Sequence, residues 1–560
     1  MKKPVLLSFL LKETLVSPKK AIVMAFVSGS SNSLILAMIN AGAQHAENSE
    51  IRPLYALVFI VGFVMYYISE RWLLGEAGGQ MEIIIHRVRT RIVKALTGAE
   101  LRDVERLGRS IIYQNVAQHT QTLSQASSTI ALTLQNVVIA VFATIYIGYL
   151  SLTTLAILAT SIGLAVFVYF RRFGTIDYDA QVSLKVENDY YTSVSDIIDG
   201  FKESKINSFK TRTLMERSRE LSARAADGRI GLAREYAAHF VFSNSVFFLL
   251  LGIMVFITPA FGNEYSSVVQ MSTTAVLFII GPISGVVGSV PLFKSATTAV
   301  EEIMALEKKL DSLRKENAGL VIDADIPENR KSLEKFFDFK IIELRNAFFE
   351  FDKNPAYPDH PFTVGPISIS IKRGETLFIT GGNGSGKTTL LRLLTGLYPL
   401  ASGSIFIDGK KLKRTDQQKF RELFAAVFSD FHLSRYLDGV RELDQDLSDH
   451  LHELFELPEN AVVEDKVFAT IDLSTGQRKR LALMTAILEQ KKILVLDEWA
   501  ADQDPVFRRK FYYEILPKLK KDGITIIAIT HDSRYFNTSD KQIHLEEGRL
   551  VNFDAEKFND

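Results

Sequence analysis

Six long apolar runs in the N-terminal part of the chain constrain its fold more than any other feature. They cover residues 21–43, 54–74, 130–150, 152–170, 240–261 and 268–293. Each is close to the ~20 residues that an α-helix needs to cross the hydrocarbon core of a bilayer. One or two such runs could be core helices of a soluble domain, but six in succession predict a membrane-embedded domain.

Basic residues indicate which ends of these runs face the cytoplasm. Lysine and arginine are dense before the first run, between the second and third, and after the fourth, whereas residues 44–53 and 262–265 contain almost none. The positive-inside rule therefore places the N-terminus, residues 75–129, residues 171–239 and the C-terminal half in the cytoplasm. Neither long segment contains proline, so both are expected to extend the spanning helices into the cytosol.

The C-terminal half contains a phosphate-binding loop. Residues 381–388 read GGNGSGKT and fit G-x-x-x-x-G-K-[ST], between a strand pattern and a leucine-rich helical pattern. The glycines let backbone N–H groups turn toward phosphates, and the helix N-terminus adds positive potential. Lys387 is predicted to reach the β- and γ-phosphates of ATP, and Thr388 to bind Mg²⁺. The residues expected around the nucleotide here are Asn383, Gly384, Ser385, Gly386, Lys387, Thr388 and Thr389.

Two later strand patterns end in residues suited to hydrolysis. Residues 493–496 lead into Asp497 and Glu498, and residues 524–530 lead into His531. Side chains at the carboxyl ends of parallel strands lie where α/β proteins bind ligands. Asp497 is expected to face Mg²⁺, Glu498 to polarise the attacking water, and His531 to hydrogen-bond the γ-phosphate.

The sequence LSTGQ at residues 473–477 resembles the LSGGQ signature of ABC ATPases, with threonine in place of the first glycine. That resemblance implies two nucleotide domains that meet head to tail. Ser474 and Gly476 of one copy would close over the ATP held by Lys387 of the other. Gln477 would open the helix whose positive N-terminus points at that γ-phosphate.

Three further positions are interpreted through the same resemblance. Asp504 matches the loop that crosses the dimer seam in the family. Phe351 falls where the family has an aromatic residue that stacks on adenine, although it could equally be a core residue of a strand. The family's usual glutamine is missing from the segment VFSDF, so Ser429 or Asp430 is expected to offer oxygen to Mg²⁺ instead.

Taken together, the two halves resemble the half-transporter architecture of ABC exporters. The expected fold is a six-helix transmembrane domain of the ABC exporter type (residues 1–300), a charged linker (301–335) and an α/β P-loop ATPase domain (336–560). Residues 101–113 and 195–209 should each hold a coupling helix. The chain contains no internal repeat and so supplies half of a two-site machine, which predicts a homodimer.

Three stretches look like the subfamily of cyclic-peptide exporters, which includes syringomycin-type and pyoverdine-precursor exporters. They are DGFKESK at 199–205, GGNGSGK at 381–387 and VFSDFHL at 427–433. The resemblance implies ATP-driven export of a peptide-like secondary metabolite or siderophore precursor across the bacterial inner membrane. A lipid or multidrug flippase, a siderophore importer of exporter fold, and a membrane ATPase that regulates a partner without moving cargo remain as alternatives.

Composition excludes other classes of protein. The chain has no cysteine, which rules out disulfides and thiolate metal sites. It has no basic stripe with interleaved aromatic residues, so nucleic acid is not expected as a partner.

Overall fold

The chain folds into two compact units. The computed structural model describes residues 5–14, 18–47, 53–257, 266–316, 337–352 and 361–551. One unit comprises Met1–Val93 and Ser110–Lys308, and the other comprises Lys94–Arg109 and Lys309–Asp560. Residues 94–109 were expected within the first domain but pack with the second. The domain boundaries at residues 300 and 336 stay predictions, and most of the predicted linker lies outside the described residues.

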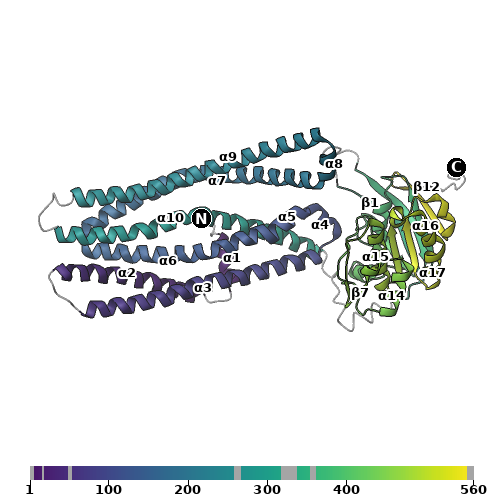
Figure 1. Cartoon of the computed structure of the whole chain (residues 1–560), viewed down its shortest axis with the longest axis horizontal. Helices are drawn as coiled ribbons and strands as arrows, with labels where there is room; N and C mark the ends of the chain where they lie inside the picture. Colours follow the sequence, from purple (N-terminus) through teal and green to yellow (C-terminus); the bar gives the residue numbers. More distant parts are fainter. Residues whose placement is uncertain are drawn as a thin grey trace. The chain divides into compact units, whose positions relative to one another are not determined.

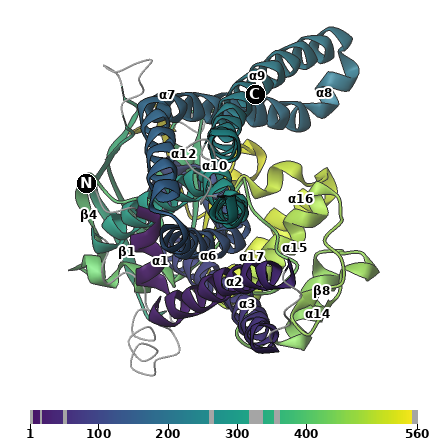
Figure 2. The same ribbon diagram turned by 90° about the vertical axis from the view of Figure 1, so that its left-hand side faces the viewer.

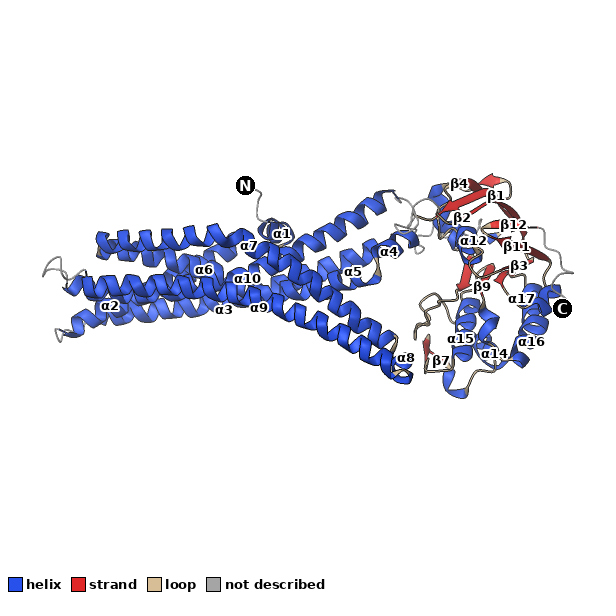
Figure 3. Ribbon diagram, turned by 90° about the horizontal axis from the view of Figure 1, so that it is seen from above, coloured by secondary structure: helices blue, strands red, loops and turns tan. Residues whose placement is uncertain are grey.

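The first unit is built of helices alone in its described part (Figure 3). Its helices are α1 (Val5–Glu13), α2 (Pro18–Glu47), α3 (Pro53–Thr97), α5 (Arg109–Tyr113), α6 (Thr120–Leu150), α7 (Leu152–Asp199), α8 (Phe201–Ile206), α9 (Ser208–Gly252) and α10 (Ser266–Glu316). Five helical segments of the described residues are long and apolar enough to cross a membrane; in α7 the described apolar part is shorter, Thr154–Gly163. Helix α10 runs through Pro282 and Pro291.

The helices pack as antiparallel neighbours. Helices α7 and α9 lie side by side and are joined at one end by the short α8 (Figures 1 and 2). The join between α6 and α7 is tight, because Ser151 alone separates the two helices and its hydroxyl accepts a hydrogen bond from the N–H of Thr154. A buried cluster that includes Ile147, Leu158 and Phe247 holds α6, α7, α9 and α10 together.

Helix α1 is tied to two longer helices, α3 and α10, by charged contacts. The guanidinium of Arg91 on α3 donates to both carboxylate oxygens of Glu13 at 3.0 Å and to Oε1 of Glu307 on α10 at 2.8 Å. Glu13 is buried. Because a buried carboxylate is costly without a partner, these contacts fix the short helix in place.

The second unit contains two main sheets (Figure 3). The six-stranded sheet has the order β12–β11–β3–β10–β9–β6, and all its pairs are parallel except β11–β12. Its strands are β3 (Thr376–Gly381), β6 (Phe424–Val427), β9 (Ile493–Asp497), β10 (Thr525–Ile529), β11 (Lys541–Glu546) and β12 (Arg549–Val551). The four-stranded sheet has the antiparallel order β2–β1–β4–β5. Its strands are β1 (Ile341–Glu350), β2 (Thr363–Lys372), β4 (Ser402–Ile407) and β5 (Lys410–Lys411).

Helices complete this unit, and β7 (Val463–Glu464) with β8 (Val467–Phe468) forms a separate hairpin. The helices are α4 (Leu101–Leu107), α12 (Lys387–Leu394), α13 (Gln417–Arg421), α14 (Gln445–Leu454), α15 (Thr475–Leu488), α16 (Pro505–Lys510) and α17 (Leu516–Lys521).

Successive side chains of the central strands point to opposite faces of the six-stranded sheet and build a hydrophobic core on each face. In β9, Ile493 and Val495 join the cluster that contains Leu390 of α12, whereas Leu494 and Leu496 join the cluster that contains Trp499. All of β9 is buried, as expected for a parallel strand covered on both faces. This packing fixes the carboxyl ends of β3, β9 and β10 side by side.

Candidate functional site

Three glycines with positive φ shape the phosphate loop between β3 and α12. Gly381, Gly384 and Gly386 have φ of 145°, 77° and 99°, a region that residues with a Cβ rarely adopt. A Cβ on Gly381 would also lie 2.3 Å from the carbonyl oxygen of Leu545. The loop predicted from the sequence therefore has the backbone that its glycines require.

The other loop residues differ in exposure. Asn383 is exposed, Thr389 is partly buried, and Ser385 is buried with an Oγ that has no hydrogen-bond partner among the described residues. A buried hydroxyl beside a loop of N–H groups is available to an oxygen-rich ligand.

Lys387 is held by the loop that precedes it. Its Nζ donates to the carbonyl oxygens of Gly381 at 3.2 Å and Gly382 at 2.9 Å. Burial lowers the pKa of this lysine, while the nearby carboxylates of Glu498 and Asp497 oppose that shift. A partly desolvated ammonium folded over the loop is well placed to exchange its carbonyl partners for phosphate oxygens.

Three oxygen-bearing side chains converge at the end of β9. Thr388 Oγ1 donates to Oδ2 of Asp497 at 3.3 Å, and Ser429 Oγ donates to the same oxygen at 3.2 Å. Burial raises the pKa of Asp497, and its Oδ1 is buried with no hydrogen-bond partner among the described residues. Two hydroxyls and a carboxylate with an unused oxygen fit the preference of Mg²⁺ for oxygen ligands.

Asp430 does not join this group. Its side chain is exposed, and no hydrogen bond or ion pair links it to Asp497 among the described residues. Of the two candidates, Ser429 is the one whose hydroxyl reaches the Asp497 carboxylate.

Glu498 and His531 are brought together from neighbouring strands. Nε2 of His531 lies 3.1 Å from Oε1 of Glu498. The backbone of Glu498 is left-handed, with φ of 51°. Its N–H donates to the carbonyl of Ile529 at 3.1 Å, and its carbonyl accepts from Nζ of Lys479 at 3.0 Å. These two hydrogen bonds, to Ile529 and from Lys479, hold the Glu498 backbone in a conformation that few non-glycine residues adopt.

Lys479 is a residue that motif reasoning missed. It lies in the helix after the LSTGQ sequence, is buried, and also forms an ion pair with Asp502 at 2.7 Å. Its signal in the sequence was a lysine on the apolar face of α15, which is unusual for a buried position.

The LSTGQ segment forms the N-terminus of α15 (Thr475–Leu488). Ser474 and Gln477 make a reciprocal capping box, in which the Ser474 Oγ accepts from the Gln477 N–H at 3.3 Å and the Ser474 N–H donates to Gln477 Oε1 at 3.1 Å. A Cβ on Gly476 would lie 3.0 Å from the carbonyl oxygen of Asp502. The glycine allows the helix to approach the segment after β9 closely.

Asp504 acts within the chain as a helix cap. Its Oδ1 accepts from the N–H groups of Val506 and Phe507 at 3.1 and 2.9 Å, and its Oδ2 pairs with Arg480 at 2.7 Å. The Phe507 N–H is the main reason that the pKa of Asp504 lies below its ordinary value. These contacts shape the loop that is predicted to cross a dimer seam.

Phe351 packs into an aromatic cluster on the four-stranded sheet. Its ring centroid lies 5.0 Å from that of Phe349, 6.2 Å from Phe362 and 6.3 Å from Tyr398. Phe351 is partly buried. Phe351 lies one residue past the end of β1 and packs against the core cluster of this sheet, and stacking on adenine stays a prediction.

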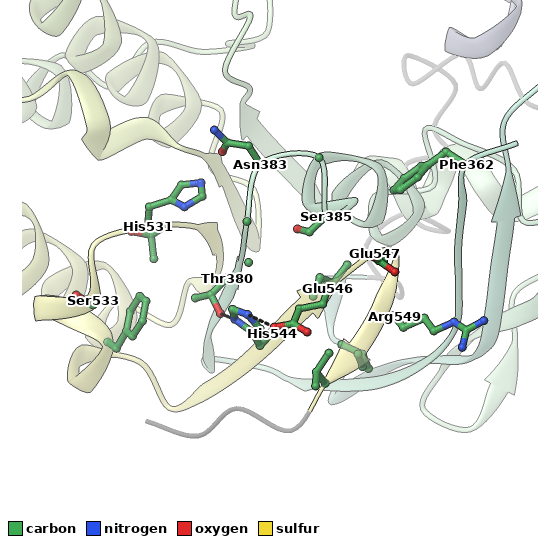
Figure 4. Close-up of a pocket in the computed structure, with 18 of the residues that line it drawn as sticks. Phe362, Thr380, Asn383, Ser385, His531, Ser533, His544, Glu546, Glu547 and Arg549 are labelled. Carbon is green, nitrogen blue, oxygen red and sulfur yellow. Dashed lines mark hydrogen bonds and ion pairs between the residues drawn. The ribbon is translucent and has the colours of Figure 1, made fainter. Parts of the chain in front are cut away.

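A cavity of about 1230 Å³ lies beside the phosphate loop (Figure 4). Asn383, Ser385 and His531 line it together with the β11–β12 hairpin, and so does Phe362, which sequence reasoning did not select. In Figure 4, His544 lies below the loop, and its Nδ1 is 2.9 Å from Oγ1 of Thr380. Asp497 and Glu498 are not among the lining residues, so the cavity marks one side of the loop rather than the carboxylates at the end of β9.

Helix α4 packs within the same unit, the second one, through charged contacts. Glu100 forms an ion pair with Arg421. The Tyr398 hydroxyl donates to Oε2 of Glu105 at 2.6 Å, and Arg392 lies 3.3 Å from Oε1 of the same carboxylate. The predicted coupling segment at residues 101–113 thus begins with a helix seated beside the helix that follows the phosphate loop.

Comparison with known proteins agrees with this geometry. Residues 364–501 match the model of the ABC transporter family. The chain is 30% identical over 535 residues to the ATP-binding protein SyrD of Pseudomonas syringae pv. syringae, covering 94% of this chain and 92% of SyrD. It is also 33% identical over 221 residues to the energy-coupling factor transporter ATP-binding protein EcfA1 of Streptococcus mutans, covering 38% of this chain and 77% of that protein.

A solved structure shares the whole fold. The structure of a bacterial Atm1-family ABC exporter with ATP bound superposes with a TM-score of 0.72 at 18% sequence identity, covering 95% of this chain and 94% of that one. The fold and the comparisons define an ATP-hydrolysing membrane transporter. The chain belongs to the ABC transporter family and has the architecture of an exporter half-transporter, with a multi-pass helical region followed by one ATPase domain.

Proposed function

We propose that this protein works as a homodimer in the bacterial inner membrane and exports a peptide-like secondary metabolite or siderophore precursor at the expense of ATP. The observation that carries the proposal is the end-to-end similarity to SyrD, joined with the three stretches that resemble cyclic-peptide exporters. We further propose a membrane domain at residues 1–300 and a cytoplasmic ATPase domain at residues 336–560.

The arrangement at β9 supports ATP hydrolysis by an in-line attack of water. Lys387 would bind the β- and γ-phosphates once it leaves its carbonyl partners. Glu498, 3.1 Å from His531, would accept the proton of the attacking water, and His531 would hold the γ-phosphate. Mg²⁺ held by Thr388, Ser429 and Asp497 would neutralise negative charge on the phosphate oxygens.

Two features support a homodimer. The hydroxyl of Ser474 is exposed at the start of α15, where an ATP molecule held by a second copy would reach it. The tip formed by α8 and its neighbours also exposes large apolar side chains, namely Ile198, Phe201, Ile206 and Phe209. Exposed apolar groups on a cytoplasmic tip favour docking onto another surface, which suits the predicted coupling segment at residues 195–209.

Vesicle uptake tests the proposal. Inverted inner-membrane vesicles should take up the peptide product of the producing cell when ATP is added, and Glu498→Gln vesicles should not. Deleting the gene should leave that peptide or its precursor inside the cell. If secretion is untouched while uptake of an external siderophore fails, the importer alternative replaces the proposal. ATPase activity without vectorial movement of any product would favour the regulatory alternative.

A further inference from the structure

Three helices of the membrane unit bring a carboxylate, a hydroxyl and an amide together. Oε2 of Glu70 on α3 accepts from Oγ of Ser28 on α2 at 2.7 Å and from Nε2 of Gln135 on α6. The same Nε2 lies 2.9 Å from Oγ of Ser28. Ser28 is fully buried and Gln135 is only 3% exposed, whereas Glu70 is partly exposed. Two buried neutral groups therefore orient one carboxylate that keeps access to its surroundings.

This cluster lies within the spanning part of the helices. Glu70 falls in the apolar run 54–74, about four residues, or ~6 Å, from its cytoplasmic end. Ser28 and Gln135 lie in the runs 21–43 and 130–150. Ionisable residues at such positions are costly and commonly mark a path for substrate, ions or protons.

The charge of Glu70 has no cationic partner in the part of the chain that the structure describes. Among the described residues, its side-chain hydrogen bonds come from Ser28 and Gln135. Lys20, the nearest basic residue along α2, lies over the ring of Trp72 at 4.9 Å instead. Both donors reach Oε2, which leaves Oε1 open to another group.

A purely structural role does not require this charge. Ala25, Leu73 and Ala131 already pack α2, α3 and α6 together about one helical turn away. Small and apolar residues of this kind are what bring membrane helices into close contact. A neutral amide at position 70 could bond to both neighbours without the cost of a carboxylate.

We propose that Glu70, positioned by Ser28 and Gln135, binds a cationic group of the cargo, an ammonium or a guanidinium. This inference rests on the proposed export function and names the chemical class of its cargo. A carboxylate near the cytoplasmic end of the spans would meet a basic cargo as it enters from the cytoplasm. Oε1 would form the ion pair, while the two neutral donors hold the carboxylate in place.

Trp72, two residues after Glu70, gives a local signal for the test. The chain has two tryptophans, Trp72 and Trp499, so Trp499→Phe leaves Trp72 as the only one. The full-length Trp499→Phe chain, in nanodiscs of zwitterionic phosphatidylcholine, would be titrated with a lauroylated pentapeptide amide that carries two lysines. The Nε-acetylated form of the same peptide is the matched uncharged probe.

We expect the lysine peptide to change Trp72 emission with an apparent affinity at least about tenfold tighter than the acetylated peptide. Glu70→Gln should remove that preference while keeping both hydrogen bonds, and Ser28→Ala should reduce it. Glu76→Gln is the control, since Glu76 lies on the same helix and its Oε1 bonds to Gln80 at 2.8 Å. The control should keep the full preference.

Several outcomes would overturn the inference. They are equal affinity for both peptides, no saturable response to the lysine peptide, or a preference that survives Glu70→Gln. If Glu70→Gln changes the pH dependence of Trp72 emission but affects the lysine and acetylated peptides equally, Glu70 binds a proton rather than a cationic cargo. If the preference is lost as expected but gene deletion traps no peptide, the site takes cations and the proposed export function fails separately.

Discussion

The chain segments around two short helices, the tip near α4 and the tip near α8, present different kinds of surface. Around α4, Glu100, Arg102, Glu105 and Arg106 all form hydrogen bonds or ion pairs with the ATPase unit. Around α8, the large side chains are apolar and exposed, with Ile206 at 89% and Phe209 at 78%. One tip is already part of a compact unit within the chain, and the other presents apolar surface to solvent.

This difference suggests different roles during the ATP cycle. The polar contacts of α4 can hold it on the ATPase domain throughout the ATP cycle, because the charged groups of α4 and of that domain tolerate water at their interface. Apolar side chains gain most when water is removed. We therefore expect the tip near α8 to be the one whose environment changes when two subunits assemble around ATP.

Trapping the ATP-bound state should give the largest effect. Glu498→Gln keeps the shape of the side chain but removes the base, so ATP hydrolysis should fall by about 100-fold or more while binding persists. Because the chain lacks cysteine, single cysteines at Ile206 and at Met215 can report maleimide reactivity. ATP should protect Ile206→Cys and leave Met215→Cys reactive. If ATP protects Ile206→Cys and Met215→Cys from maleimide equally, the expected change at the tip near α8 is wrong.

Charging the α8 tip should be the next largest effect. The double change Phe201→Asp and Phe209→Asp places carboxylates where apolar docking is expected, which should lower transport-coupled ATPase activity about tenfold or more. Folding should persist, since both positions are exposed. Met215→Asp, on the exposed side of α9, is the control. Activity like that of the control would show that this tip does not dock.

Removing one partner of the α4 contact should cost stability rather than turnover. Among the described residues, Glu100→Ala leaves the Arg421 guanidinium with the carbonyl of Gly396 as its remaining partner. A fully buried pair would lose about 3–5 kcal/mol, and because both side chains keep some solvent we expect about 1–2 kcal/mol. Hydrogen exchange in residues 94–109 should rise. Glu220→Ala, which removes an exposed ion pair on α9, should leave that exchange unchanged.

The Mg²⁺ requirement of ATP hydrolysis should depend on Ser429 and not on the adjacent Asp430. Ser429→Ala removes a hydroxyl that reaches Asp497 and should raise the Mg²⁺ concentration needed for half-maximal ATPase activity several-fold. Asp430→Ala should leave it unchanged. A titration in which only Asp430→Ala shifts the Mg²⁺ requirement would reverse the assignment. The same assay with Ile206→Cys would show whether Mg²⁺ binding is needed before the α8 tip is protected.

Sequence reasoning succeeded where chemistry fixes both residue type and spacing. The loop of Gly381 to Lys387, the strand before Asp497 and the helix after Ser474 each follow from local patterns that only one fold satisfies. It did not find Lys479 or Phe362, because their roles depend on which segments meet in space. It also could not separate Ser429 from Asp430, since one residue of register decides which side chain turns toward Asp497. The Glu70 cluster joins three helices and has no local signature beyond an acid within an apolar run.

The smallest expected effect concerns the acid dependence of the α4 contact. Arg106 donates to Asp352 Oδ2 at 2.5 Å and Arg102 donates to Oδ1 at 2.9 Å. The bond from Arg106 is the main reason that the pKa of Asp352 lies below its ordinary value. A lowered pKa means that this contribution is complete above the ordinary pKa of about 4 and is lost as the pH falls through the lowered value.

Asp352→Asn should therefore weaken the contact at neutral pH and remove its response to acid. Asp352 is 56% exposed, so we expect a change of only about 0.5 kcal/mol. Hydrogen exchange at α4, followed from pH 7 to below pH 4, measures it, with Asp338→Asn, at another exposed ion pair, as the control. If exchange at α4 in the Asp352→Asn variant matches the parent at every pH and salt concentration, α4 is held by Glu100 and Glu105 alone. The comparison between the tips would then rest on fewer charges but would still stand.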